Sequence, residues 1–154
     1  QAQFDFVTGI NEKVSEAHQT IIDIREIRKQ INAYTELLKD NDSAKDLIAK
    51  AKEINEALTK VEEELYQTKN RSGQDPLNYP IRLTNKLAGV AQLAAVGDVR
   101  PTKQSYEAKE DLTKRIDVQL AEYRKVRDTE LPKFNEMIRQ KAIDPIMVRK
   151  PARS

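Results

Sequence analysis

The chain has 154 residues, of which 34% are charged and 5% aromatic, and its formal net charge is +2. This length suits a single domain with its own core, and the scarcity of aromatic residues and glycine argues against a β-sandwich. The absence of cysteine excludes disulfide frameworks and thiolate metal sites. The longest apolar run, residues 87–97, falls well short of the ~20 residues that span a bilayer.

The first predicted element is a helical hairpin. Apolar residues recur at steps of three and four over residues 6–39 and again over residues 44–69, which predicts two long amphipathic helices. We expect Ser43 to cap the second helix, with Asp46 completing a capping box. Because the connection is short, the two helices are predicted to pack antiparallel. The apolar stripe of the second helix consists of Ala44, Leu47, Ala51, Ile54, Leu58, Val61 and Leu65.

A third, shorter helix is predicted over residues 80–96, after a run of turn residues. It carries no charge between Lys86 and Asp98, and small apolar residues occupy almost every face. A helix that is apolar all round is usually buried on several sides. We therefore expect this helix to be the most enclosed element of the fold.

The fourth predicted helix extends from a cap at Thr102 to about residue 138. Pro132 lies inside it, and a proline there removes one backbone hydrogen bond and clashes with the preceding turn. This predicts a kink near residues 128–131, or two abutting helices. Together, the elements predict an all-α fold, an antiparallel four-helix bundle with a long N-terminal helical hairpin and a kinked fourth helix.

We assign residues 1–142 to the bundle and residues 143–154 to an extended basic tail. We interpret the tail as a solubilising terminus, or as a helix end whose cations offset the helix dipole, because nucleic-acid binders usually spread basic charge over a folded face. A helical arm that binds nucleic acid stays an alternative hypothesis. No signal peptide is visible, and because the chain opens on Gln1 we expect a processed product or an excised fragment.

Residues with distinctive chemistry are sparse. His18 is the single histidine, so neither a zinc site nor the paired Glu-x-x-His motifs of a di-iron bundle can be assembled around it. The serines lack a nucleophile-elbow motif, and His18 would be their sole candidate base. We therefore predict no catalytic residues, no metal ligands and no cofactor. The acidic run 62–64 is interpreted as part of a solvated helix face.

The most distinctive segment covers residues 75–87. In one hypothesis it is a structural clamp, with Tyr79 packed on the hairpin and Asn78 capping the third helix. In the other it is a docking surface for a neighbouring domain. We favour the clamp, because buried aromatic residues in turns usually serve packing. The candidate residues for either role are Leu77, Asn78, Tyr79, Pro80 and Arg82.

Three stretches together resemble a known family. They are residues 3–31, with Gln-Phe-Asp-Phe at 3–6 and Lys-Val-Ser-Glu-Ala-His at 13–18, then Leu77–Leu87, and then Gly97–Tyr106. They are similar to the C-terminal helical region of large bacterial sortilin-like proteins built on Asp-box (BNR) repeat β-propellers. Proteins of this family are commonly labelled glycosyl hydrolase or sialidase-like. The resemblance covers most of residues 3–135, and its middle stretch is the most specific.

The resemblance implies an exported protein, in the periplasm or outside the cell, in which the propeller performs any recognition. This chain has no Asp-box and no tryptophan, and none of its matching positions is a catalytic position of the family. The favoured function is therefore a non-catalytic C-terminal module that packs on an adjacent β-propeller domain or engages a protein partner. The alternatives are a free-standing coiled-coil adaptor that binds a partner helix and the nucleic-acid-binding arm.

Overall fold

The computed structural model describes residues 2–66, 82–96 and 100–141 of the chain. All regular secondary structure in these ranges is helical. The predicted all-α bundle of four helices is thereby confirmed, because the fourth helix continues through a π-helical turn into a final segment. The elements are α1 (Ala2–Leu38), α2 (Lys45–Leu65), α3 (Leu83–Val96), α4 (Lys103–Lys125), the π turn (Val126–Glu130) and α5 (Leu131–Gln140).

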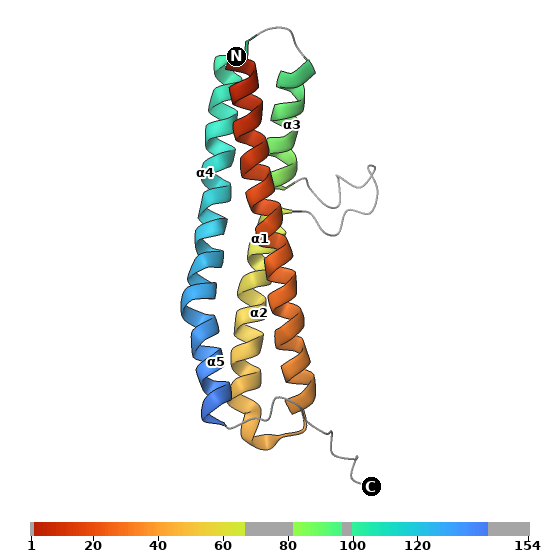
Figure 1. Ribbon diagram of the computed structural model, residues 1–154, viewed down its shortest axis with the longest axis vertical. Helices are drawn as coiled ribbons and strands as arrows, with labels where there is room; N and C mark the ends of the chain where they lie inside the picture. Colours follow the sequence, from red (N-terminus) through yellow and green to blue (C-terminus); the bar gives the residue numbers. More distant parts are fainter. Residues whose placement is uncertain (1, 67–81, 97–99, 142–154) are drawn as a thin grey trace.

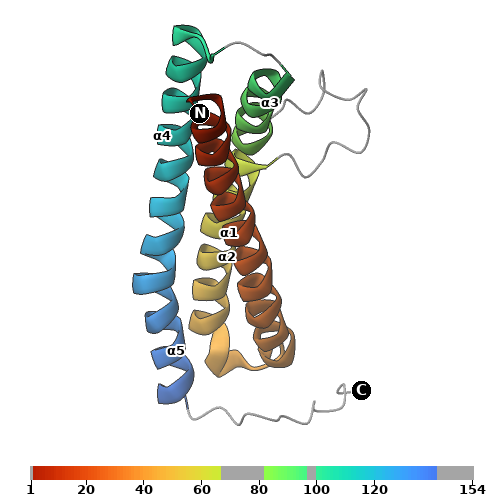
Figure 2. The same cartoon turned by 45° about the horizontal axis from the view of Figure 1, so that its top comes forward.

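The bundle is an elongated rod whose length is set by α1. At about 1.5 Å per residue, the 37 residues of α1 span roughly 55 Å. In Figure 1, α2 returns antiparallel along the lower half of α1, α3 lies along the upper half, and α4 with α5 runs down the whole length. Figure 2 shows the same arrangement with its top tilted toward the viewer, again with α2 and α3 at different levels. Both α2 and α3 therefore pack against α1 and α4, at different levels of the rod.

The core follows the predicted apolar stripes. All seven residues of the predicted α2 stripe are buried, and Leu58 and Leu65 have no exposed surface. From α1 and α4, Ile10, Ile24 and Ile116 are also completely buried. Each such side chain contributes about 1.5–3 kcal/mol on transfer from water. The hairpin between α1 and α2 is thus held by a continuous apolar seam.

The turn between α1 and α2 differs in detail from the prediction. A short 3-10 helix (Asp42–Ala44) precedes α2, and its cap is Asn41, whose side chain accepts from the Ser43 N–H. The predicted capping residue, Ser43, therefore lies inside this turn. Asp46 accepts from the neighbouring Leu47 N–H at 2.9 Å instead of closing a capping box. The Asn41 side chain reaches the backbone two residues on, which is a common arrangement in turns.

The start of α4 and the end of α2 were also predicted from the sequence. The cap at Thr102 is confirmed, since its hydroxyl accepts from the Ser105 N–H at 3.0 Å. The predicted continuation of the second helix to residue 69 is wrong, because Tyr66 is already extended. The buried hydroxyl of Thr84 donates to the Leu65 carbonyl at 2.8 Å. This bond satisfies one of the carbonyls that a helix end leaves free.

The prediction that the third helix is the most enclosed element is wrong. α3 packs against α1 and α4 at the edge of the bundle, so one of its faces stays outside. It buries Thr84, Leu87 and Ala91 and exposes Ala88, Gln92, Leu93 and Ala95. Apolar composition on all faces did not lead to burial on all faces, because composition does not specify how many neighbours a helix has.

The predicted interruption of the fourth helix is found as a π-helical turn directly before Pro132. The Leu131 N–H donates to the Val126 carbonyl, five residues back. Pro132 has no N–H, and its ring would clash with the carbonyl of Asp128 in a regular helix. The widened turn removes that conflict and lets the helix continue into α5.

An ion pair ties this π turn to α2. Lys50 donates to Glu130, and their side chains are 17% and 26% exposed. The hydrogen bond from Lys50 lowers the pKa of Glu130 below its ordinary 4.5. The hydrogen bond from Glu130 raises the pKa of Lys50 above its ordinary 10.5.

We expect this pair to contribute to acid sensitivity. Because folding lowers the pKa of Glu130, its contribution to the unfolding free energy is complete above about pH 4.5 and is lost as the pH falls through the folded pKa. The contribution of Lys50 is lost only above pH 10.5. The wild type should lose more unfolding free energy between about pH 6 and pH 3 than Lys50→Met does, by up to ~1 kcal/mol. Urea unfolding at each pH measures this difference.

A matched control is Lys114→Met. Lys114 pairs with Glu110 along the surface of α4, and these side chains are 74% and 68% exposed. Such solvent-exposed pairs contribute little to stability. Between pH 6 and pH 3, the unfolding free energy of Lys114→Met should fall as much as that of the wild type. If the unfolding free energy of Lys50→Met falls as much as that of the wild type over this pH range, the Lys50–Glu130 pair does not contribute to acid sensitivity.

The assignment of residues 143–154 to a basic tail lies outside the described residues. The described part of the bundle reaches Lys141, whose ammonium group lies 3.0 Å from the Asp46 carboxylate. None of the described helices combines the length and apolar content that crossing a bilayer requires.

Candidate interaction surface

The segment singled out in the sequence can be placed only at its end. Leu77, Asn78, Tyr79 and Pro80 lie outside the described residues, so the clamp and docking hypotheses both stay predictions. Arg82 directly precedes α3, and its carbonyl accepts from the Lys86 N–H at 3.0 Å. Its Nε atom is buried and has no hydrogen-bond partner among the described residues.

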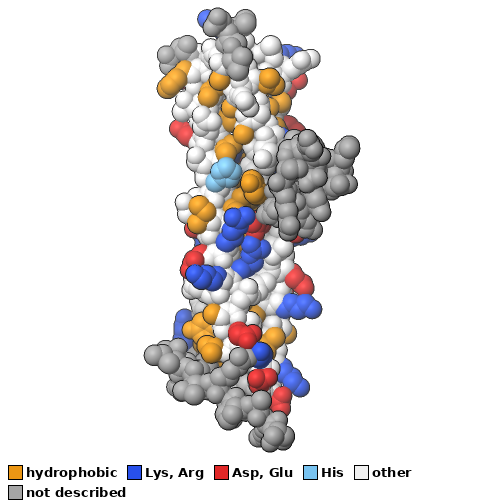
Figure 3. Space-filling view, turned by 90° about the vertical axis from the view of Figure 1, so that its right-hand side faces the viewer, with side chains coloured by type: hydrophobic (Ala, Val, Ile, Leu, Met, Phe, Trp, Pro, Cys, Tyr) orange, Lys and Arg blue, Asp and Glu red, His pale blue; other side chains and the backbone are white. Residues whose placement is uncertain are grey.

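His18 lies on the exposed side of α1, where Figure 3 shows it as the pale-blue side chain. Its ring meets Tyr66 edge to face, with ring centroids 6.1 Å apart. Ile21, Ile22 and Arg25 complete the lining of an open cavity of about 270 Å³ beside this pair. In the described part of the chain, no group of three or more histidine, cysteine or acidic side chains is placed to hold a metal ion.

The interpretation of the acidic run 62–64 as solvated is wrong for its first member. Glu62 is 4% exposed and lies between two arginines of α1. Arg25 donates from Nε to Glu62 at 2.8 Å, and Arg28 donates to the same carboxylate. Arg28 also donates to the Thr59 hydroxyl at 2.8 Å. A carboxylate buried in this way is stabilised by both guanidinium groups.

These contacts belong to a polar ladder along one edge of the α1–α2 interface. A further rung is the Asn55 amide, which donates to the Asn32 side chain at 2.9 Å. The pairs Arg25–Glu62, Arg28–Thr59 and Asn32–Asn55 share one antiparallel register, because the residue numbers of each pair have the same sum. This is the pairing of an antiparallel hairpin whose turn lies at residues 42–44. The sequence contained this signal, because a short turn fixes which residues face one another.

The outward face of α3 carries the most exposed of the large hydrophobic side chains in the described part of the chain. Leu93 is 80% exposed, and no charged residue occurs between Lys86 and the end of the helix. We call the exposed residues Ala88, Gln92, Leu93 and Ala95 the α3 surface. Figure 3 shows hydrophobic side chains gathered mainly on the upper half of the molecule, whereas basic side chains gather below His18.

The N-terminal end of α1 lies beside this surface. The Gln3 side chain donates to the Ala94 carbonyl of α3. In the same first turn of α1, Phe4 is 68% exposed. Exposed apolar side chains therefore occur on both helices at the end of the rod where α1 begins.

Comparisons with family models, with curated proteins and with solved structures gave no match to this chain. A function for this chain is therefore inferred from its own sequence and surfaces.

Proposed function

We propose that this chain is a non-catalytic helical packing module, the C-terminal helical part of a larger exported protein of the sortilin-like, Asp-box repeat type. In this role it packs on the β-propeller domain of the same protein, in the periplasm or outside the cell. The propeller, and not the helical module, performs any recognition of ligands.

The observation that carries this proposal is the α3 surface. Uncharged, exposed apolar patches on a folded protein commonly mark sites where another protein surface binds. Leu93 leaves 80% of its surface in solvent, whereas Thr84, Leu87 and Ala91 bury another side of α3 in the bundle. Because Gln3 contacts the Ala94 carbonyl, a domain joined to the N-terminal end of α1 would be tethered directly beside this surface.

The absence of cysteine allows a direct test by thiol labelling. A Leu93→Cys substitution is made in the 154-residue chain and in the parent protein freed of other reactive cysteines. We expect rapid alkylation in the isolated chain, where position 93 is exposed, and much slower alkylation in the parent protein, where the propeller covers it. The rates are compared by mass spectrometry under native conditions.

A matched control is Val118→Cys on α4, which is 59% exposed. Its alkylation rate should be the same in the two proteins, because α4 is not part of the α3 surface. A parent reading frame without Asp-box repeats, or equal labelling of Leu93→Cys in both proteins, would contradict the proposed function.

A further inference from the structure

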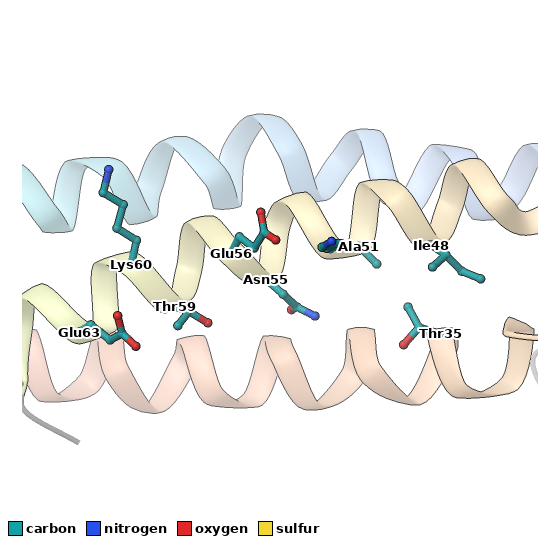
Figure 4. Close-up of a pocket in the computed structure, with 9 residues that line it drawn as sticks. Thr35, Ile48, Ala51, Asn55, Glu56, Thr59, Lys60 and Glu63 are labelled. Atoms are coloured by element: carbon teal, nitrogen blue, oxygen red, sulfur yellow. The ribbon is translucent and has the colours of Figure 1, made fainter. Parts of the chain in front are cut away.

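A groove runs along the lower half of the bundle, between α1 and the outer face of α2. Its volume is about 430 Å³. Figure 4 shows Thr35 reaching into it from α1, with Asn55 and Thr59 on the side of α2 that faces α1. Because these side chains are short, they do not fill the groove, and another helix can approach α2 closely there.

Four charged residues of α2 also line this groove, and they alternate in sign along the helix. They are Lys52, Glu56, Lys60 and Glu63. Their spacing of three or four residues places them on one face of α2. All four are exposed, and in the described part of the chain none of them forms an ion pair. On α4, by contrast, exposed charges are paired within the helix, as in Lys114–Glu110 and Arg115–Asp111.

The order of these charges is self-complementary in the antiparallel direction. The midpoint of Lys52–Glu63 falls between Ala57 and Leu58, and that of Glu56–Lys60 falls half a residue away, at Leu58. A two-fold axis crossing α2 there places each lysine opposite a glutamate of a second α2 helix, and the reverse pairs follow by symmetry. A parallel arrangement places lysine opposite lysine and glutamate opposite glutamate, which is unfavourable.

We propose that two copies of this chain associate through this groove, with their α2 helices antiparallel. Lys52 pairs with Glu63 of the second copy, and Glu56 pairs with Lys60 of the second copy, so the interface contains four intermolecular ion pairs. The groove is lined mainly by α2, and α2 and α3 lie at different levels of the rod (Figure 1). Association of two copies is therefore compatible with packing on a propeller and does not depend on it.

The test uses two charge variants of the 154-residue chain. The acidic variant carries Lys52→Glu and Lys60→Glu, and the basic variant carries Glu56→Lys and Glu63→Lys. In the acidic variant all four groove charges are negative, and in the basic variant all four are positive. Sedimentation equilibrium over a micromolar to millimolar series, at low and high salt, measures the association of each protein and of their mixture.

We expect a wild-type dimer that weakens as salt is added. Each variant alone should associate more than about tenfold more weakly than the wild type, because like charges face each other. The equimolar mixture should recover a heterodimer, since every facing pair is again of opposite charge. This recovery distinguishes direct pairing across the interface from a general effect of net charge.

The matched control is Lys103→Glu with Lys114→Glu, which changes the net charge as the acidic variant does but on α4, where these side chains are 91% and 74% exposed. It should dimerise like the wild type. Circular dichroism verifies that each protein is folded, and Lys52→Glu mixed with Glu63→Lys serves if a double variant is not. A wild-type chain that stays monomeric, or a mixture that does not recover association, overturns the proposal. The groove would then be free for a helix of another protein.

Discussion

Leu58→Asp is expected to unfold the chain. Leu58 belongs to the α2 stripe and has no exposed surface. Truncating a buried leucine to alanine typically costs about 2–5 kcal/mol. An aspartate also buries a charge in the apolar core, which costs several kcal/mol more. The sum is comparable to the total stability of a domain of this size, about 5–15 kcal/mol.

Circular dichroism at 222 nm, followed during thermal unfolding, measures this effect directly. The matched control is Leu93→Asp, because it makes the same chemical change at a side chain that is 80% exposed. The control should melt within a few degrees of the wild type. A cooperative transition at the wild-type temperature for Leu58→Asp would show that the α2 stripe is not the seam of the bundle.

The helices themselves could be predicted because their signal is local. Steps of three and four between apolar residues place a stripe on one face of a helix, whatever the rest of the chain does. For this reason every residue of the predicted stripe from Ala44 to Leu65 is buried. The position of the π turn was predictable on similar grounds, because Pro132 lacks the N–H that a regular helix needs.

The errors concern properties that depend on neighbours. The third helix was predicted to be enclosed because it is apolar on all faces, but it lies at the edge of the bundle and exposes Leu93. The second helix was extended past Leu65, since nothing in its own sequence shows that Thr84 would bind the Leu65 carbonyl. A contact between residues far apart in sequence follows only from the way the helices pack.

The candidate surfaces also depend on how the helices pack. The segment from Leu77 to Pro80 could be identified as a candidate from its composition. By contrast, the exposed face of α3 and the groove charges of α2 became visible only once burial was known. Glu62 was taken for a surface residue because it stands in an acidic run. Its role depends on Arg25 and Arg28, which are brought opposite it by the hairpin.

Glu62→Lys is expected to be the second most damaging substitution, with a loss of about 3–5 kcal/mol of unfolding free energy. The carboxylate of Glu62 is buried and accepts from both Arg25 and Arg28. A lysine there places a third positive charge between two guanidinium groups and leaves all three without a counter-ion. Glu62→Gln keeps the shape and an acceptor oxygen, so a smaller loss of about 1–2 kcal/mol is expected.

Urea unfolding of these variants beside Glu122→Lys, an exposed change on α4, separates the local effect from that of net charge. The decisive comparison is the triple variant Arg25→Glu, Arg28→Glu, Glu62→Lys, in which the signs of the cluster are reversed. If the polar ladder acts by pairing charges across the hairpin, the triple variant should be more stable than Glu62→Lys alone. If Glu62 matters only through its packing volume, reversing the arginines brings no recovery, and the ladder does not contribute to the register of α1 and α2.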